Sequence, residues 1–129
     1  MGACYSVDLT IKTKDAAATV AAIKKYMEEN PRKAVFSLGE WSKHGVGTES
    51  LDDLVKIMLA GWPGLAFRKE DEPQGFTTYR NEFDASYGWQ MVMEGMFEAM
   101  GPTLENGSEI FIEADNSRVT YTVEDGEVY

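Results

Sequence analysis

Apolar and polar side chains alternate along residues 3–13. One side of this segment carries Ala3, Tyr5, Val7, Leu9 and Ile11, and the other carries Cys4, Ser6, Asp8, Thr10 and Lys12. A period of two is typical of a strand that buries one face and leaves the other in water. The sequence therefore predicts a half-buried strand at the start of the fold.

A helical period follows over residues 16–29. Asp15 can cap this helix, and Asn30 with Pro31 ends it, because the residue before a proline disfavours the helical conformation. The apolar positions fall on one face, which consists of Ala16, Val20, Ile23 and Met27. This face is expected to pack against the sheet.

A second helical segment occupies residues 49–60, with Thr48 or Ser50 as its cap. Asp52 and Asp53 lie in the first turn, where the helix dipole favours negative charge. Its expected buried stripe is Leu51, Leu54, Val55 and Met58. The segment GWPG at residues 61–64 ends the helix, because a proline cannot continue it.

Short strands are expected at residues 33–41 and 65–69, a longer strand at residues 75–83, and a hairpin at residues 109–124 with its turn at 115–117. The hairpin's apolar positions are Ile110, Ile112, Ala114, Val119, Tyr121 and Val123. This order predicts a single α+β domain, residues 1–129. It should have a mostly antiparallel sheet of about four to five strands and helices packed on one face, as in a ferredoxin-like or related sandwich.

The methionine-rich segment SYGWQMVMEGMFEAM, residues 86–100, predicts a third helix that Asp84 or Ser86 can cap. At 100° per residue its core face contains Trp89, Val92, Met93, Met96, Phe97 and Met100. Tyr87 and Met91 lie outside this face, beside two glutamates. They are either ordinary exposed side chains or part of a contact patch.

Negative charge is concentrated in the second half of the chain. Residues 1–69 contain ten basic and eight acidic residues, whereas residues 70–129 contain two basic and fourteen acidic residues, and the whole chain carries a net charge of −10. A nucleic acid is not expected as a direct ligand of the acidic half, because phosphate contacts need lysine and arginine. A basic protein surface is the expected partner.

A set of acidic and exposed residues is the candidate partner-binding surface. Its members are Tyr87, Met91, Glu94, Glu98, Glu109, Glu113, Glu70, Asp71 and Glu72. A continuous negative patch of this kind could present phosphate-like charge to a basic groove. The simpler alternative is that these acids only keep the protein soluble.

Residues for metal binding or nucleophilic catalysis are scarce. The chain has one cysteine, Cys4, and one histidine, His44, so it contains no zinc ligand set, and its carboxylates lack the calcium-loop spacing. Cys4 is expected to be a small buried or half-buried side chain, and His44 an exposed loop residue. We therefore expect no catalytic residue, metal or cofactor.

No apolar run approaches the roughly 18 residues that a membrane-spanning helix needs, and no charged leader precedes an apolar core. A single cysteine suits a reducing compartment. The expectation is a soluble, cytoplasmic protein that does not contact a membrane.

The segment from Asp84 to Val128 contains SYGW, FEAMGPTLENGS, EIFIEAD and VEDGEV, and it resembles small α+β proteins carried by bacterial phages and conjugative elements. Such proteins include inhibitors of host defence, for example anti-CRISPR and anti-restriction proteins, several of which mimic DNA. The resemblance covers about a third of the chain. It implies a non-catalytic inhibitor that occludes the basic surface of a nucleic-acid-binding host defence protein. The basic first half favours a local acidic patch over mimicry by the whole surface.

Two other functions stay open at the level of sequence. One is a small enzyme or small-molecule-binding module, with a pocket near Trp41, His44 and Trp62 in the middle loops. The other is self-association as a homodimer through an exposed sheet edge.

Overall fold

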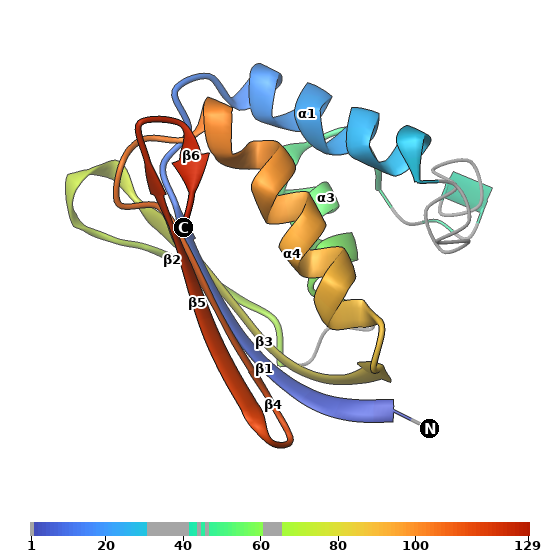
Figure 1. Ribbon diagram of the computed structural model, residues 1–129. Helices are drawn as coiled ribbons and strands as arrows, with labels where there is room; N and C mark the ends of the chain where they lie inside the picture. Colours follow the sequence, from blue (N-terminus) through green and yellow to red (C-terminus); the bar gives the residue numbers. More distant parts are fainter. Residues whose placement is uncertain (1, 31–41, 44, 46, 61–65) are drawn as a thin grey trace.

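The computed structural model describes residues 2–30, 42–43, 45, 47–60 and 66–129 (Figure 1). Its strands are β1 (Gly2–Ile11), β2 (Arg68–Asp71), β3 (Thr77–Ser86), β4 (Glu109–Ala114), β5 (Ser117–Glu124) and β6 (Glu127–Val128). Its helices are α1 (Ala16–Glu29), α3 (Leu51–Met58) and α4 (Trp89–Met100), and two short 3₁₀ turns are η2 (Pro73–Gly75) and η3 (Gly101–Thr103).

The strands form one antiparallel sheet in the order β2-β3-β1-β4-β5-β6. β1 lies at its centre and pairs with β3 along its whole length, from Gly2 opposite Ser86 to Ile11 opposite Thr77. The first four strands in this order, with helices between β1 and β2 and between β3 and β4, have the ferredoxin-like arrangement. The α+β fold class is thus confirmed, with six described strands in place of four to five.

The additional strand follows a tight turn that the sequence interpretation passed over. Asp125 and Gly126 adopt φ values of 51° and 78°, and they reverse the chain so that β6 pairs with the end of β5. Positive φ at both central residues is the geometry that an Asp-Gly pair favours in a two-residue hairpin. The predicted hairpin ended at residue 124, so the Asp-Gly pair that follows was not assigned to a turn.

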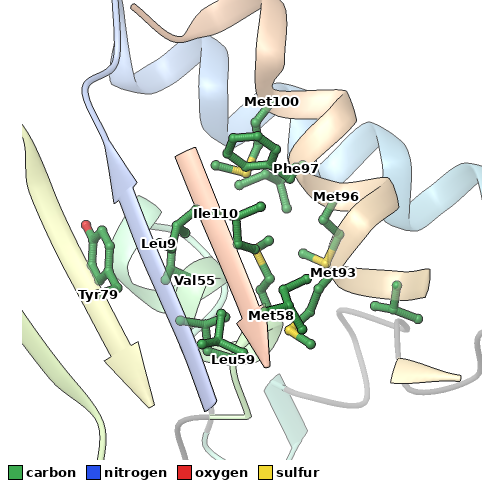
Figure 2. Close-up of a cluster of buried hydrophobic side chains, with 14 of the residues drawn as sticks. Leu9, Val55, Met58, Leu59, Tyr79, Met93, Met96, Phe97, Met100 and Ile110 are labelled. Atoms are coloured by element: carbon green, nitrogen blue, oxygen red, sulfur yellow. The ribbon is translucent and has the colours of Figure 1, made fainter. Parts of the chain in front are cut away.

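The helices lie on one side of the curved sheet, and the hydrophobic core fills the space between the two layers (Figure 1). Figure 2 shows Leu9 and Ile110 of the sheet beside Met58, Met93 and Phe97 of the helices. All six residues that the helical period of 86–100 assigned to the core are buried. The odd-numbered side of β1 is buried as well, which confirms the predicted alternation.

The end of α3 is fixed to both layers by side chains. The indole Nε1 of Trp89 donates a hydrogen bond to the carbonyl oxygen of Met58 at 2.9 Å, and the Nδ2 of Asn81 donates to that of Leu59 at 2.7 Å. Carbonyl groups at a helix C-terminus lack partners within the helix, so these bonds replace the missing ones. They also explain why the polar side chain of Asn81 is buried in the core.

The predicted start of the last helix was wrong. Asp84 and Ser86 belong to β3, and α4 begins at Trp89 without a capping side chain. The ten residues of β1 offer hydrogen-bond partners as far as Ser86, so the ladder continues past Phe83 where the sequence suggested a helix cap. The expectation that Cys4 is buried or half-buried was also wrong, because its side chain is exposed on the side of the sheet opposite the described helices.

The remaining predicted elements have mixed outcomes. Asp15 caps α1 and Ser50 caps α3, and the latter forms a reciprocal capping box with Asp53. On α1 the buried residues are Thr19, Ile23 and Met27, whereas Ala16 is exposed. The predicted strand at 33–41 and the end of the second helix at 61–64 lie outside the described residues. No described helix has the length and apolar character needed to cross a membrane.

Candidate functional site: the open face of the sheet

The helices cover one side of the sheet, and no described helix lies on the other (Figure 1). The strand register places the even-numbered residues of β1 and their partners on this uncovered side. Its charged residues are Asp8, Glu70, Glu82, Asp84, Glu109, Glu113, Glu124 and Glu127, with Arg68, Arg80 and Arg118. We call this surface the acidic face.

Two arginines of the acidic face are bound by their own neighbours. The Nε of Arg80 lies 3.3 Å from Asp8 Oδ1, and its Nη1 lies 3.2 Å from Glu70 Oε2. Arg118 Nε lies 2.7 Å from Glu113 Oε2. Within the described part of the chain, the five other carboxylates of this face form no ion pair; they are Glu82, Asp84, Glu109, Glu124 and Glu127. The face therefore keeps an uncompensated negative charge on a rigid support.

An open hollow of about 490 Å³ lies on this face at the start of β1. Its lining residues are Cys4, Tyr5, Ser6, Glu82, Phe83, Asp84, Glu113, Ala114 and Asp115. The four carboxylates come from β3, β4 and the turn after β4, and they meet because β1 lies between β3 and β4. The sheet order thus brings together acids that are distant in sequence.

Cys4 is one of the residues that line this hollow. Its Sγ donates a hydrogen bond to Asp84 Oδ1 at 2.9 Å, and its backbone N–H donates to Asp115 Oδ1 at 3.3 Å. The hydrogen bond to Asp84 and the negative charge of that carboxylate raise the pKa of the Cys4 thiol above its ordinary value. The thiol therefore stays protonated at neutral pH, which makes it a poor nucleophile.

Ionised carboxylates accept hydrogen bonds and cannot donate them, so the acidic face suits cationic donors such as guanidinium and ammonium groups. It repels phosphate. No group of three or more histidine, cysteine or acidic side chains in the described residues is placed to hold a metal ion. The chemistry of this face is therefore recognition of positive charge.

The structure divides the predicted partner-binding residues between two sides of the sheet. Three of them lie on the acidic face: Glu70, Glu109 and Glu113. Asp71 occupies the opposite side of β2 by alternation, and Glu72 follows that strand. The others, Tyr87, Met91, Glu94 and Glu98, belong to the helical layer or the turn before it. The sequence had suggested one continuous patch, whereas the sheet separates its parts.

Within the helical group, Tyr87 and Met91 are 57% and 65% exposed, as the sequence indicated. Glu94 accepts a hydrogen bond of 2.6 Å from the hydroxyl of Tyr121. This hydrogen bond raises the pKa of the Tyr121 hydroxyl above its ordinary value. Glu94 thus links α4 to β5. A residue held in this way has less freedom to meet a partner than Glu82 or Glu109 of the open face, whose carboxylates accept no side-chain hydrogen bond from another described residue.

Sequence reasoning missed four members of the acidic face: Asp8, Glu82, Asp84 and Glu127. The alternation of Thr78, Arg80, Glu82 and Asp84 continues through β3 and could have revealed two of them. Asn81 obscured this pattern, because it puts a polar residue on the buried side. The rival pocket residues Trp41, His44 and Trp62 lie outside the described residues.

Comparisons of this chain with protein-family models, with curated proteins and with solved structures gave no match.

Proposed function

We propose that this chain is a non-catalytic binding protein that uses its acidic face to occlude the basic surface of a nucleic-acid-binding protein. One observation supports this above all: five carboxylates that form no ion pair with a described residue share the side of the six-stranded sheet that the described helices leave open. Hydrogen bonding within the sheet fixes their backbone positions, so they are ordered before a partner arrives.

The distribution of charge supports a local acidic surface. Described lysines such as Lys24, Lys25 and Lys56 belong to α1 and α3, on the side of the sheet opposite the acidic face. Negative charge on one side of the sheet and positive charge on the other produce an electric field that orients an approaching basic protein toward the acidic face. The same field speeds association. A partner that normally binds phosphates offers the complementary lysine and arginine side chains.

The resemblance of residues 84–128 to proteins of phages and conjugative elements supports a partner within a bacterial defence system. In this proposal the chain acts as an anti-CRISPR or anti-restriction type of inhibitor, and a nucleic acid competes with it for the same basic groove. Inhibition by occlusion needs no catalytic residue, metal or cofactor.

The test begins with capture from a bacterial lysate on the immobilised chain, followed by binding of the purified captured protein. The informative variant is Glu82→Lys with Glu109→Lys, which reverses two unpaired charges of the acidic face. The matched control is Glu28→Lys with Glu29→Lys, which makes the same change of net charge on exposed positions of α1. We expect the first variant to weaken binding at least tenfold, or about 1.4 kcal/mol, and the control to bind nearly as the native chain does.

Two further readouts test the mechanism. Binding should weaken as salt is added, and duplex DNA or RNA should displace the chain from its partner. If both charge variants lose binding equally, the loss follows from the change of net charge alone. The acidic face would then not be the binding site. A third variant, Met91→Lys with Glu98→Lys, reports on the helical group, and loss confined to this variant would place the interface there.

A further inference from the structure

The loop that precedes β4 contains an asparagine directly followed by a glycine, Asn106-Gly107, and both residues are exposed. This dipeptide is chemically prone to deamidation. The backbone nitrogen of the glycine can attack the side-chain Cγ of the asparagine, and glycine has no Cβ to hinder the approach. The reactivity of Asn106 therefore depends on how the fold holds these two groups.

Two hydrogen bonds join this pair to residues 123–128, the end of β5 with β6, which we call the hairpin end. The N–H of Gly107 donates to the carbonyl oxygen of Val123 at 3.0 Å, so the attacking nitrogen is directed toward β5. The Oδ1 of Asn106 accepts a hydrogen bond of 2.8 Å from the N–H of Asp125. Attack of the nitrogen on Cγ requires the first bond to break and the side-chain amide to rotate away from the second.

The backbone of the loop adds another restraint. The N–H of Ser108 donates to the carbonyl oxygen of Glu105 at 3.2 Å, and Gly107 has a φ of 89° whereas Asn106 has no positive φ. These features define a type II turn. The ψ of its first central residue, about +120°, places the nitrogen of Gly107 away from the Cβ of Asn106 around the Cα–C bond. Ring closure requires these two atoms to be nearly eclipsed, so the turn also opposes the reaction.

We propose that Asn106 is a latent deamidation site, which the hairpin end blocks in the folded chain and which reacts when the hairpin end separates from the loop. A bond then forms between the nitrogen of Gly107 and Cγ of Asn106, while the bond from Cγ to Nδ2 breaks. The amide proton of Gly107 leaves with the amino group as ammonia. Water opens the cyclic imide and produces aspartate or isoaspartate, so the net reaction replaces the amide with a carboxylate and needs no oxidant or reductant.

Both products change the loop. Each adds a negative charge beside Glu105 and next to the turn that contains Asp125. Isoaspartate also lengthens the main chain by one carbon, so the bonds to Val123 and Asp125 can no longer both form in their present geometry. An opening of the hairpin end that leads to reaction is thus recorded permanently in the chain, whether or not the acidic face binds a partner.

Incubation of the folded chain, and of the chain unfolded in guanidinium chloride, at the same mildly alkaline pH tests the proposal. Digestion with pepsin in acid followed by mass spectrometry measures conversion at Asn106. We expect conversion to be about tenfold faster or more in the unfolded chain, because no free energy of opening opposes the reaction there.

Two variants weaken the hairpin end in an otherwise folded chain. Gly126→Val places a branched side chain at a φ of 78°. Asp125→Pro removes the N–H that bonds Asn106, and proline cannot adopt the φ of 51° found there. Both should accelerate conversion at Asn106 several-fold in the folded state. The matched control is Gly88→Val, at a position where a Cβ meets no atom closer than 4.0 Å, and it should convert at the native rate.

Conversion at equal rates in the folded and unfolded chains would overturn the proposal. So would a native rate in both hairpin-end variants when circular dichroism shows them to be folded. If a variant fails to fold, the comparison of the folded and unfolded native chain still decides. An unfolded chain in which Asn106 is not converted would show that this pair is not a modification site.

Discussion

The phenolic hydroxyl of Tyr79 on β3 donates a hydrogen bond of 2.6 Å to Asp52 Oδ1 in the first turn of α3. The other carboxylate oxygen of Asp52 lies 2.8 Å from the Nζ of Lys69 on β2. One carboxylate thus joins a helix to two strands. Burial of Tyr79 and its bond to Asp52 raise the pKa of this hydroxyl far above its ordinary value, so it remains a donor at physiological pH.

Tyr79→Phe should lower the free energy of unfolding by about 1 kcal/mol, since the ring stays packed and one hydrogen bond is lost. Urea unfolding followed by fluorescence measures the change. Tyr129→Phe is the control, because its hydroxyl bonds Glu127 in an exposed position and its removal should leave stability unchanged. Equal stability of Tyr79→Phe and the native protein would contradict a structural role for this bond.

Asp52→Asn should destabilise the protein at neutral pH and have a smaller effect in acid. Burial alone would raise the pKa of Asp52, but hydrogen bonds from Lys69 and Tyr79 outweigh it and lower the pKa in the folded state. A lowered folded pKa gives stability that is present above the unfolded value of about 4 and is lost as the pH falls through the folded pKa. Urea unfolding at neutral pH and at about pH 3 measures the difference in free energy of unfolding between the native protein and the variant. The same difference at both pH values would contradict a contribution from ionised Asp52.

Gly95→Ala should destabilise the protein, because a Cβ at this position would collide with the hydroxyl of Tyr26 where α1 and α4 approach each other. A loss of about 1–3 kcal/mol in the free energy of unfolding is typical of overpacking. The double variant with Tyr26→Phe removes the colliding oxygen and should recover part of the loss. Gly88→Ala is the matched control, since its Cβ would meet no atom closer than 4.0 Å. Similar losses at both glycines would indicate a general effect on α4.

Alkylation of Cys4 by a neutral maleimide should be slow at neutral pH and should accelerate with pH, because the raised pKa leaves little thiolate. Asp84→Asn removes the negative charge that stabilises the protonated thiol, so it should increase the rate at neutral pH several-fold. Thiol loss followed by mass spectrometry measures the rate. The same rate in both proteins would show that Asp84 does not control this thiol.

The strands and helices with a clear period could be predicted from sequence, because burial of one face imposes that period. β1 and the core face of α4 are the examples, with Leu9 and Met96 buried as expected. The boundary at Asp84 could not be found in this way, since it depends on the length of β1, which is a distant partner. Local propensity at residues 84–86 suggested a helix cap, and tertiary pairing overrode it.

The sequence showed that the candidate site is acidic, but it did not show which acidic residues lie on the same side of the molecule. The excess of acid in residues 70–129 was evident, yet grouping Glu94 with Glu109 required them to share a side of the molecule. They occupy opposite layers, because α4 crosses the sheet on the helical side. Only the strand order shows that Glu82 of β3 and Glu113 of β4 line the same hollow, with β1 between them.

The central place of β1 has a consequence for the growing chain on the ribosome. Its two neighbours are residues 77–86 and 109–113, so β1 gains its second neighbour only after residue 113 has been synthesised. Until β4 emerges, an apolar strand edge is exposed in the nascent protein, where it can pair with other chains. Contacts of such long sequence separation also slow folding. The sheet that organises the acidic face is therefore completed only after residues 109–113 have been synthesised.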